Sequence, residues 1–231
     1  MQTKILLSQK ATSILLLAGI LLFASCKKDE HPAPEPQPIP VKLQEYRDGD
    51  DFIRFQYNAD GSIKKATVKN EINTSGDIVD FNIVYNADKK ISEVNSSSGE
   101  KIVPVYENAV LKRADYFMDG ARTGYTNYEF QNGNMKRATV YQGAGVDYMP
   151  LLDFIYTYNA GGNVTEGVIM VATDIPNYMT RLGHAELQYD QKTNPLFVHK
   201  DFLALLWQGT SKNNTIVENV YDAQLQLQER Y

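Results

Sequence analysis

The strongest constraint on the fold is a pattern that recurs seven times along the chain. In each copy an aromatic residue ends a stretch that alternates apolar and polar residues, and in most copies Asn or Asp and a short turn follow. The aromatic residues of the seven copies are Tyr57, Tyr85, Tyr106, Phe130, Tyr158, Tyr189 and Tyr221. A unit that repeats on this scale predicts a repetitive architecture.

Each unit is typical of a β-hairpin. Asn and Gly tolerate the positive φ that tight hairpin turns require, and both occur in NADG at 58–61 and NGN at 132–134. Ile63, Met135 and Val164 come just after their turns, where return strands with alternating apolar residues begin. We therefore predict an all-β fold, an antiparallel meander of about six hairpins and roughly 12–15 strands that forms a curved sheet or a partly closed shell.

Two segments break the strand pattern. Asn as the N-cap and Pro as the first helical residue, at 194–195, with Gly209 at the end, predict a helix near 195–207. A second short helix is predicted within 173–183. The first helix either plugs an open end of the sheet or forms a mobile lid that brings Trp207 over a ligand.

The hairpin units, Tyr-Asn/Asp-x-x-Gly-x-hydrophobic, resemble YD/RHS repeats, which build curved antiparallel sheets and shells. Together with YDQKTNP at 189–195, SKNN at 211–214 and VYD at 220–222, their order is similar to a family of uncharacterised Bacteroidota lipoproteins with a porin-like, RHS-like β fold. The resemblance covers residues 42–231, although two units, among them 104–117, lack the glycine. That family has no agreed activity, so the resemblance implies a fold but no catalytic residue.

The N-terminal segment predicts export and lipid attachment. Residues 1–25 combine a basic start with a short uncharged apolar run and small residues, as in a secretory signal peptide. Ala24 and Ser25 stand directly before Cys26, the only cysteine, and this junction resembles the lipobox of bacterial lipoproteins. We expect acyl chains on Cys26 to bind outer-membrane lipid. The alternative is an ordinary signal peptide followed by an unmodified cysteine.

The segment after the cysteine predicts where the chain is displayed. Lys28, Asp29 and Glu30 resemble the export signal of Bacteroidota surface lipoproteins, which implies the outer face of the outer membrane. The alternative is a solvated charged linker. Residues 26–41 are rich in proline and predict an extended linker. The remaining residues, 42–231, have the length of a single β domain.

Composition and motifs argue against several functions. The net charge of −5 and the pI of about 5.3 disfavour nucleic acid as a partner. Metal-ligand spacings, a nucleophile elbow and a phosphate loop do not occur in the sequence, so we predict no metal, no cofactor and no enzyme activity. The pairs Asp77 and Asp80, and Asp147 and Asp153, are interpreted as surface acids rather than glycosidase carboxylates.

These observations favour a non-catalytic binding or interaction module at the outer-membrane surface. Two longer interruptions of the pattern, 143–153 and 172–184, carry the candidate ligand-binding residues Tyr148 and Tyr178, and Trp207 is the third candidate. Tyr and Trp combine a flat apolar face with a polar tip, which suits a glycan or a peptide. Two alternatives stay open: a structural subunit of an envelope protein complex, and a periplasm-facing carrier of an apolar ligand.

Overall fold

The computed structural model describes residues 42–69, 78–145, 147–175 and 178–230. All of them belong to one compact unit, Lys42–Tyr231. The predicted signal peptide, Cys26, the predicted export signal Lys28–Glu30 and the proline-rich linker lie outside the described residues, so they stay predictions.

The described residues form one open sheet of fourteen strands, each paired with its neighbours in chain order. Every pairing is antiparallel, so the predicted meander is confirmed. The strands are β1 (Glu45–Asp48), β2 (Asp51–Tyr57), β3 (Ile63–Lys69), β4 (Ile78–Tyr85), β5 (Ile91–Ser96), β6 (Glu100–Glu107), β7 (Val110–Met118), β8 (Ala121–Gln131), β9 (Asn134–Ala144), β10 (Asp147–Tyr158), β11 (Val164–Ala172), β12 (Met179–Thr193), β13 (Asn213–Tyr221) and β14 (Leu227–Arg230).

The repeated aromatic residues mark a shift of strand register beside the turns. In six of the seven units the aromatic residue ends its strand or precedes the last residue, and there it pairs with an apolar residue at the first or second position of the return strand. These pairs are Tyr57–Ile63, Tyr85–Ile91, Tyr106–Leu111, Phe130–Met135, Tyr158–Val164 and Tyr221–Leu227. Such irregularities bend a strand and increase its twist, so repeating them curves the sheet. The seventh residue, Tyr189, lies inside β12 instead.

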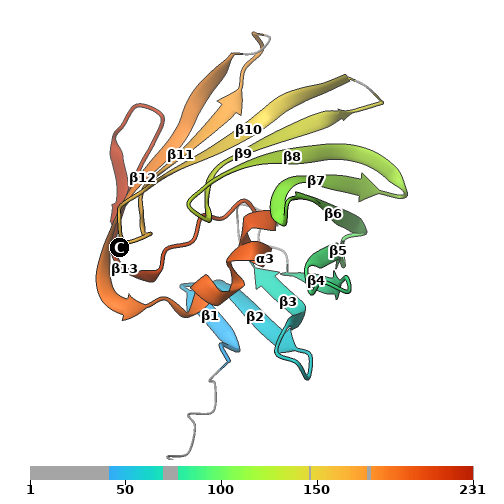
Figure 1. Ribbon diagram of the computed structural model, residues 1–231. Helices are drawn as coiled ribbons and strands as arrows, with labels where there is room; N and C mark the ends of the chain where they lie inside the picture. Colours follow the sequence, from blue (N-terminus) through green and yellow to red (C-terminus); the bar gives the residue numbers. More distant parts are fainter. Residues whose placement is uncertain (1–41, 70–77, 146, 176–177, 231) are drawn as a thin grey trace, which may run out of the picture. The chain divides into compact units, whose positions relative to one another are not determined.

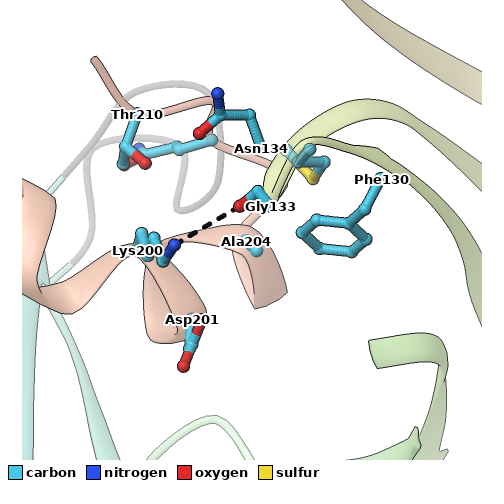
Figure 2. A pocket seen from close by; sticks show the side chains of 9 residues that line it. Phe130, Gly133, Asn134, Lys200, Asp201, Ala204 and Thr210 are labelled. Atoms are coloured by element: carbon cyan, nitrogen blue, oxygen red, sulfur yellow. Dashed lines mark hydrogen bonds between the residues drawn. The ribbon is translucent and has the colours of Figure 1, made fainter. Parts of the chain in front are cut away.

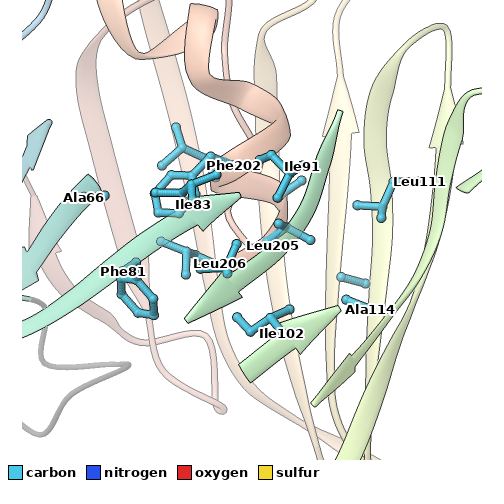
Figure 3. Packing of buried hydrophobic residues seen from close by; sticks show 14 of the residues in the cluster. Ala66, Phe81, Ile83, Ile91, Ile102, Leu111, Ala114, Phe202, Leu205 and Leu206 are labelled. Atoms are coloured by element: carbon cyan, nitrogen blue, oxygen red, sulfur yellow. The ribbon is translucent and has the colours of Figure 1, made fainter. Parts of the chain in front are cut away.

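The concave face of the sheet is filled by the segment that links β12 to β13. This segment forms the 3₁₀ helix η1 (Pro195–His199) and the helix α3 (Lys200–Leu205), and the sheet curves round it (Figure 1). Apolar residues of α3 and the following Leu206 pack among residues of β3 to β7 such as Phe81, Ile83 and Ile102 (Figure 3). Each such side chain contributes about 1.5–3 kcal/mol when it is fully buried. We call the covered face the inner face and its opposite the outer face.

The predicted first helix is confirmed, but it ends two residues early. Asn194 is the N-cap, and its side chain accepts a hydrogen bond from the Leu196 N–H at 2.9 Å. The chain leaves the helix through Trp207, whose φ of 61° is left-handed, rather than at Gly209. Neither helix of the described part is long and apolar enough to cross a membrane.

Two predictions about the second half of the chain are wrong. The interruption at 143–153 is a tight hairpin, because β9 and β10 stay paired as far as Ala144 and Asp147. The described residues of 173–183 form no helix, and those from Met179 onward belong to β12. The main chain of Thr173 donates to the Tyr178 carbonyl at 3.0 Å and closes that hairpin. Pairing with the neighbouring strands satisfies backbone groups that a short isolated helix would leave open.

Candidate functional site

Trp207 is part of the packing between α3 and the sheet. Its Nε1 donates to the Tyr116 hydroxyl at 2.9 Å and to Thr126 Oγ1 at 3.0 Å, and its ring stacks on Phe154 at 5.5 Å. The Tyr156 hydroxyl donates to the Trp207 carbonyl at 2.7 Å. These contacts use the polar group of the indole within the protein, which agrees with a plug rather than a lid.

The three predicted residues are not brought together. Tyr178 lies at the β11–β12 hairpin and is 57% exposed, whereas Tyr148 is a partly buried residue of β10. In the described residues no ring contact joins Tyr148, Tyr178 and Trp207. Trp207 contacts the rings of Tyr116 and Phe154 on the inner face, whereas Tyr148 belongs to a group of partly exposed aromatic side chains.

Tyr148 lies in a cluster on the outer face of β8, β9 and β10. Tyr125 of β8 and Tyr141 of β9 are cross-strand partners, and their rings stack at 4.6 Å with an interplanar angle of 11°. The Tyr148 ring meets Tyr125 edge to face at 5.3 Å. The Arg122 guanidinium lies 4.7 Å from the Tyr125 centroid and 5.0 Å from that of Tyr148. We call Arg122, Tyr125, Tyr141 and Tyr148 the outer tyrosine cluster.

Strand alternation places this cluster on the outer face. Thr126 and Tyr128 of β8 are buried on the inner face, where Thr126 binds Trp207, so Tyr125 points the other way. All three tyrosines of the cluster are partly exposed. The hydroxyls of Tyr125 and Tyr141 make no hydrogen bond within the described residues, and Tyr148 makes only a long one of 3.4 Å to the Arg122 carbonyl. The cluster therefore offers ring surface and free hydroxyls.

A second feature of the site is an ion pair beside the tyrosines. Asp115 of β7, the cross-strand partner of Tyr125, accepts hydrogen bonds from Nη2 of both Arg113 and Arg122. The Asp115 side chain is 13% exposed, whereas the Arg113 and Arg122 side chains are 43% and 30% exposed. Two guanidinium groups thus surround one carboxylate.

The carboxylates weighed from the sequence are separated. Asp153 is 2% exposed and binds the Arg137 guanidinium and Thr139, while Asp147 is exposed at the β9–β10 hairpin. Asp80 pairs with Lys65 at 2.8 Å, and the hydrogen bond from Lys65 lowers the pKa of Asp80. Asp77 lies outside the described residues. The parts of the chain that are described contain no group of three metal-ligating side chains.

A small cavity lies between the β8–β9 turn and α3 (Figure 2). It is lined by Phe130, Met135 and Ala204 among others, and Lys200 Nζ donates to the Gly133 carbonyl at 3.3 Å at its rim. Its volume of about 10 Å³ is room for one water molecule. This cavity is too small to hold a ligand.

Sequence reasoning missed Arg122, Tyr125 and Tyr141. The sequence feature that bears on their pairing is the tight turn at Asn132–Gly133, which sets the register of β8 against β9 next to the turn. The irregularity between Glu129 and Phe130 moves that register by one residue and sets Tyr125 opposite Tyr141. Without that shift, counting back from the turn pairs neither tyrosine with the other.

Comparisons with known proteins show little similarity. No protein-family model matches the chain, and no curated protein matches it. Similar solved structures include a crystal structure of TcdB2-TccC3-TEV, with a TM-score of 0.37, 12% identity and coverage of 78% of this chain and 8% of that chain. The Photorhabdus luminescens Tc holotoxin pore has a TM-score of 0.22 at 12% identity, with 78% and 11% covered. A TcdB2-TccC3 structure has a TM-score of 0.22 at 11% identity, with 78% and 12% covered.

The chain spans 8% to 12% of the length of these neighbours. At these TM-scores and identities the neighbours give no information about function. Membership of the Bacteroidota lipoprotein family stays a prediction.

Proposed function

We propose that the chain is a lipid-anchored outer-membrane protein whose β domain is a non-catalytic glycan-binding module. The outer tyrosine cluster is the observation that carries this proposal. It combines the stacked rings of Tyr125 and Tyr141 with hydroxyls that make no hydrogen bond to the described residues. Sugar rings stack on aromatic faces and hydrogen-bond to nearby polar tips. The long paired strands β8, β9 and β10 hold these groups in fixed positions.

A glycan fits this surface better than a peptide. Extended peptides commonly bind by adding a strand to the exposed edge of a sheet. Here the edge strands β1 and β14 have only four residues each and carry charged side chains, which discourages such pairing. The outer tyrosine cluster lies on strands in the middle of the sheet, away from both edge strands.

The anchor is tested by replacing its cysteine. Cys26→Ala should move the protein from the membrane to the soluble fraction, because the acyl chains are the proposed attachment. Retention of that variant in the membrane would contradict the anchor. Replacing Lys28, Asp29 and Glu30 by Ala should protect the protein from protease added to intact cells if these residues direct surface export.

Glycan binding is tested by thermal melting of the mature Cys26→Ala chain against a glycan panel. A ligand that binds only the folded state raises the midpoint, with stabilisation of about 2.7 kcal/mol at a hundredfold excess over its Kd. Tyr141→Ala should remove the shift, whereas Tyr46→Ala, at an exposed tyrosine of β1, should keep it. Equal shifts in the two variants would mean that the tyrosine cluster is not the site.

A second candidate function is that of a subunit in an envelope protein complex. Exposed apolar side chains gather on the hairpins β9–β10 and β11–β12: Met149 is 71% exposed, Ile175 63%, Tyr178 57% and Leu182 53%. Exposed apolar surface is typical of protein contacts. If this candidate is correct, Met149→Ser with Ile175→Ser should abolish cross-linking to a partner on whole cells, while Tyr141→Ala should not.

A further inference from the structure

We infer that the glycan bound at the outer tyrosine cluster is anionic, with its carboxylate or sulfate against Arg113 and Arg122; this rests on the proposed function of the same surface. The Arg122 guanidinium lies beside the tyrosines, and the Arg113 guanidinium lies beside Asp115, the cross-strand partner of Tyr125. Arg122 is within 5.0 Å of the centroids of Tyr125 and Tyr148, and Arg113 shares Asp115 with Arg122. A sugar ring on the tyrosines therefore has its substituents within reach of these groups.

Arg113, Arg122 and Asp115 together carry a net positive charge although the whole chain is acidic. Arg113 and Arg122 together carry two positive charges, and Asp115 supplies one negative charge. The carboxylate is the most covered of the three side chains, at 13% exposure, and the two cations face solvent more openly. Since the chain carries a net charge of −5, an anion is attracted here only at short range.

Both arginines also keep donors for a ligand. A guanidinium has five N–H donors, and the hydrogen bonds to Asp115 use Nη2 of each arginine. In the described residues Nη1 of Arg113 and of Arg122 donates to no protein acceptor. Planar guanidinium groups bind carboxylate and sulfate-like oxyanions through charge-assisted hydrogen bonds, which are stronger than those of neutral groups.

The test compares three trisaccharides by calorimetry on the detergent-solubilised mature protein: a galacturonate, a sulfated galactose and a neutral galactose trisaccharide. We expect at least one anionic trisaccharide to bind about tenfold tighter than the neutral one, a difference that corresponds to about 1.4 kcal/mol. The preference should shrink at high salt, because the attraction is electrostatic. The two anionic probes distinguish carboxylate from sulfate as the group recognised.

Variants then locate the anion. Arg122→Gln and Arg113→Gln should each weaken binding of the anionic trisaccharide several-fold, and by a larger factor than binding of the neutral one. Arg113 is the more exposed, so its variant serves if Arg122→Gln fails to fold. Arg47→Gln is the matched control, because Arg47 also pairs with a carboxylate, Glu45, and lies over a ring, Phe52, but at the β1 edge.

The outcomes separate this inference from the function on which it rests. Equal affinity for neutral and anionic trisaccharides, or an anionic preference that survives both arginine substitutions, overturns the inference and leaves a glycan-binding module. Binding of none of the three overturns the inference, and the wider glycan panel then decides the proposed function. Equally tight binding of an acidic peptide would overturn the choice of a saccharide.

Discussion

At the scale of single residues, the hairpin turns show how a backbone conformation restricts the residue types that a position accepts. The turn between β8 and β9 uses Asn132 and Gly133, both with positive φ, of 53° and 76°. The turn between β6 and β7 has the same conformation without a glycine, at Asn108 and Ala109, with φ of 47° and 68°. A left-handed conformation costs an Ala roughly 1–2 kcal/mol and costs Gly nothing comparable.

Exchanging the two residue types therefore should move stability in opposite directions. Ala109→Gly should raise the free energy of unfolding by about 1 kcal/mol, because it removes the left-handed strain. Gly133→Ala should lower it by a similar amount, about 1 kcal/mol. Urea unfolding monitored by Trp207 fluorescence measures both. Destabilisation by Ala109→Gly would show that the turn is not strained.

Glu100, at the start of β6, makes stability depend on pH. Burial raises the pKa of the Glu100 carboxyl above its value in the unfolded chain. Between the two values the folded state binds more protons, so this group's contribution to stability falls as pH rises and stays low above the folded-state pKa. Glu100→Gln should therefore stabilise the protein at pH 7 and flatten the loss of stability above about pH 4.5. A variant whose melting temperature follows the wild type across pH 4 to 7 would contradict this role.

At the scale of elements, the plug formed by η1 and α3 is attached to strands at two points. Where η1 meets α3, His199 Nε2 lies 2.9 Å from the Tyr57 hydroxyl, and that hydroxyl also donates to the Leu43 carbonyl. The hydroxyl has one proton, so His199 must donate from Nε2. Burial lowers the pKa of His199, which favours the neutral ring that this arrangement uses. At its end, Trp207 binds the inner face.

Removing the polar contact of Trp207 tests the attachment. Trp207→Phe should destabilise the protein by about 1–3 kcal/mol, because the Tyr116 and Thr126 hydroxyls lose a donor in a buried site. Tyr156→Phe is the matched control, since it removes one hydrogen bond to the main chain of residue 207 and keeps the indole in place. Its expected cost is about 1 kcal/mol. Thermal melting compares the two variants. If Trp207→Phe leaves the stability unchanged, the plug is held only loosely against the sheet.

At the scale of the whole described unit, the sheet is open, so two edge strands must be kept from pairing with other chains. β1 and β14 are short, and β14 ends in Gln228, Glu229 and Arg230 beside Leu227, which is 54% exposed. Charged residues on an exposed edge oppose strand addition. The predicted all-β class and the curvature are confirmed, and no strand pairing closes β1 onto β14 in the described residues.

Removing a charge from an edge strand should make pairing with other chains easier. Glu229→Val should promote association of the protein, because it removes a charge from β14 and leaves a more apolar edge strand that is paired on one side only. Light scattering during size-exclusion chromatography measures the change. Glu186→Val, a change of the same chemistry at an exposed residue of the fully paired strand β12, is the control and should stay unassociated.

The sequence by itself determined the elements that depend on local rules. Turn residues with positive φ, strand alternation and the Asn194–Pro195 cap specify backbone conformation within a few residues. The meander, the curved sheet and the plug helix were therefore predictable. The same local rules placed a helix at 173–183, where they failed because the pairing of Met179–Gly183 with β11 outweighs a weak helical pattern.

Only the tertiary structure decided which side chains meet. Tyr125, Tyr141 and Tyr148 come from three strands, and their contact depends on the register shifts within β8, β9 and β10. A one-residue shift moves a side chain to a different neighbour or to the other face, and of these shifts only the one at Phe130 coincides with a repeated aromatic residue. The sequence made Trp207 a candidate ligand-binding residue. In the fold it is a packing residue, because the inner face supplies two hydroxyls that accept from its N–H.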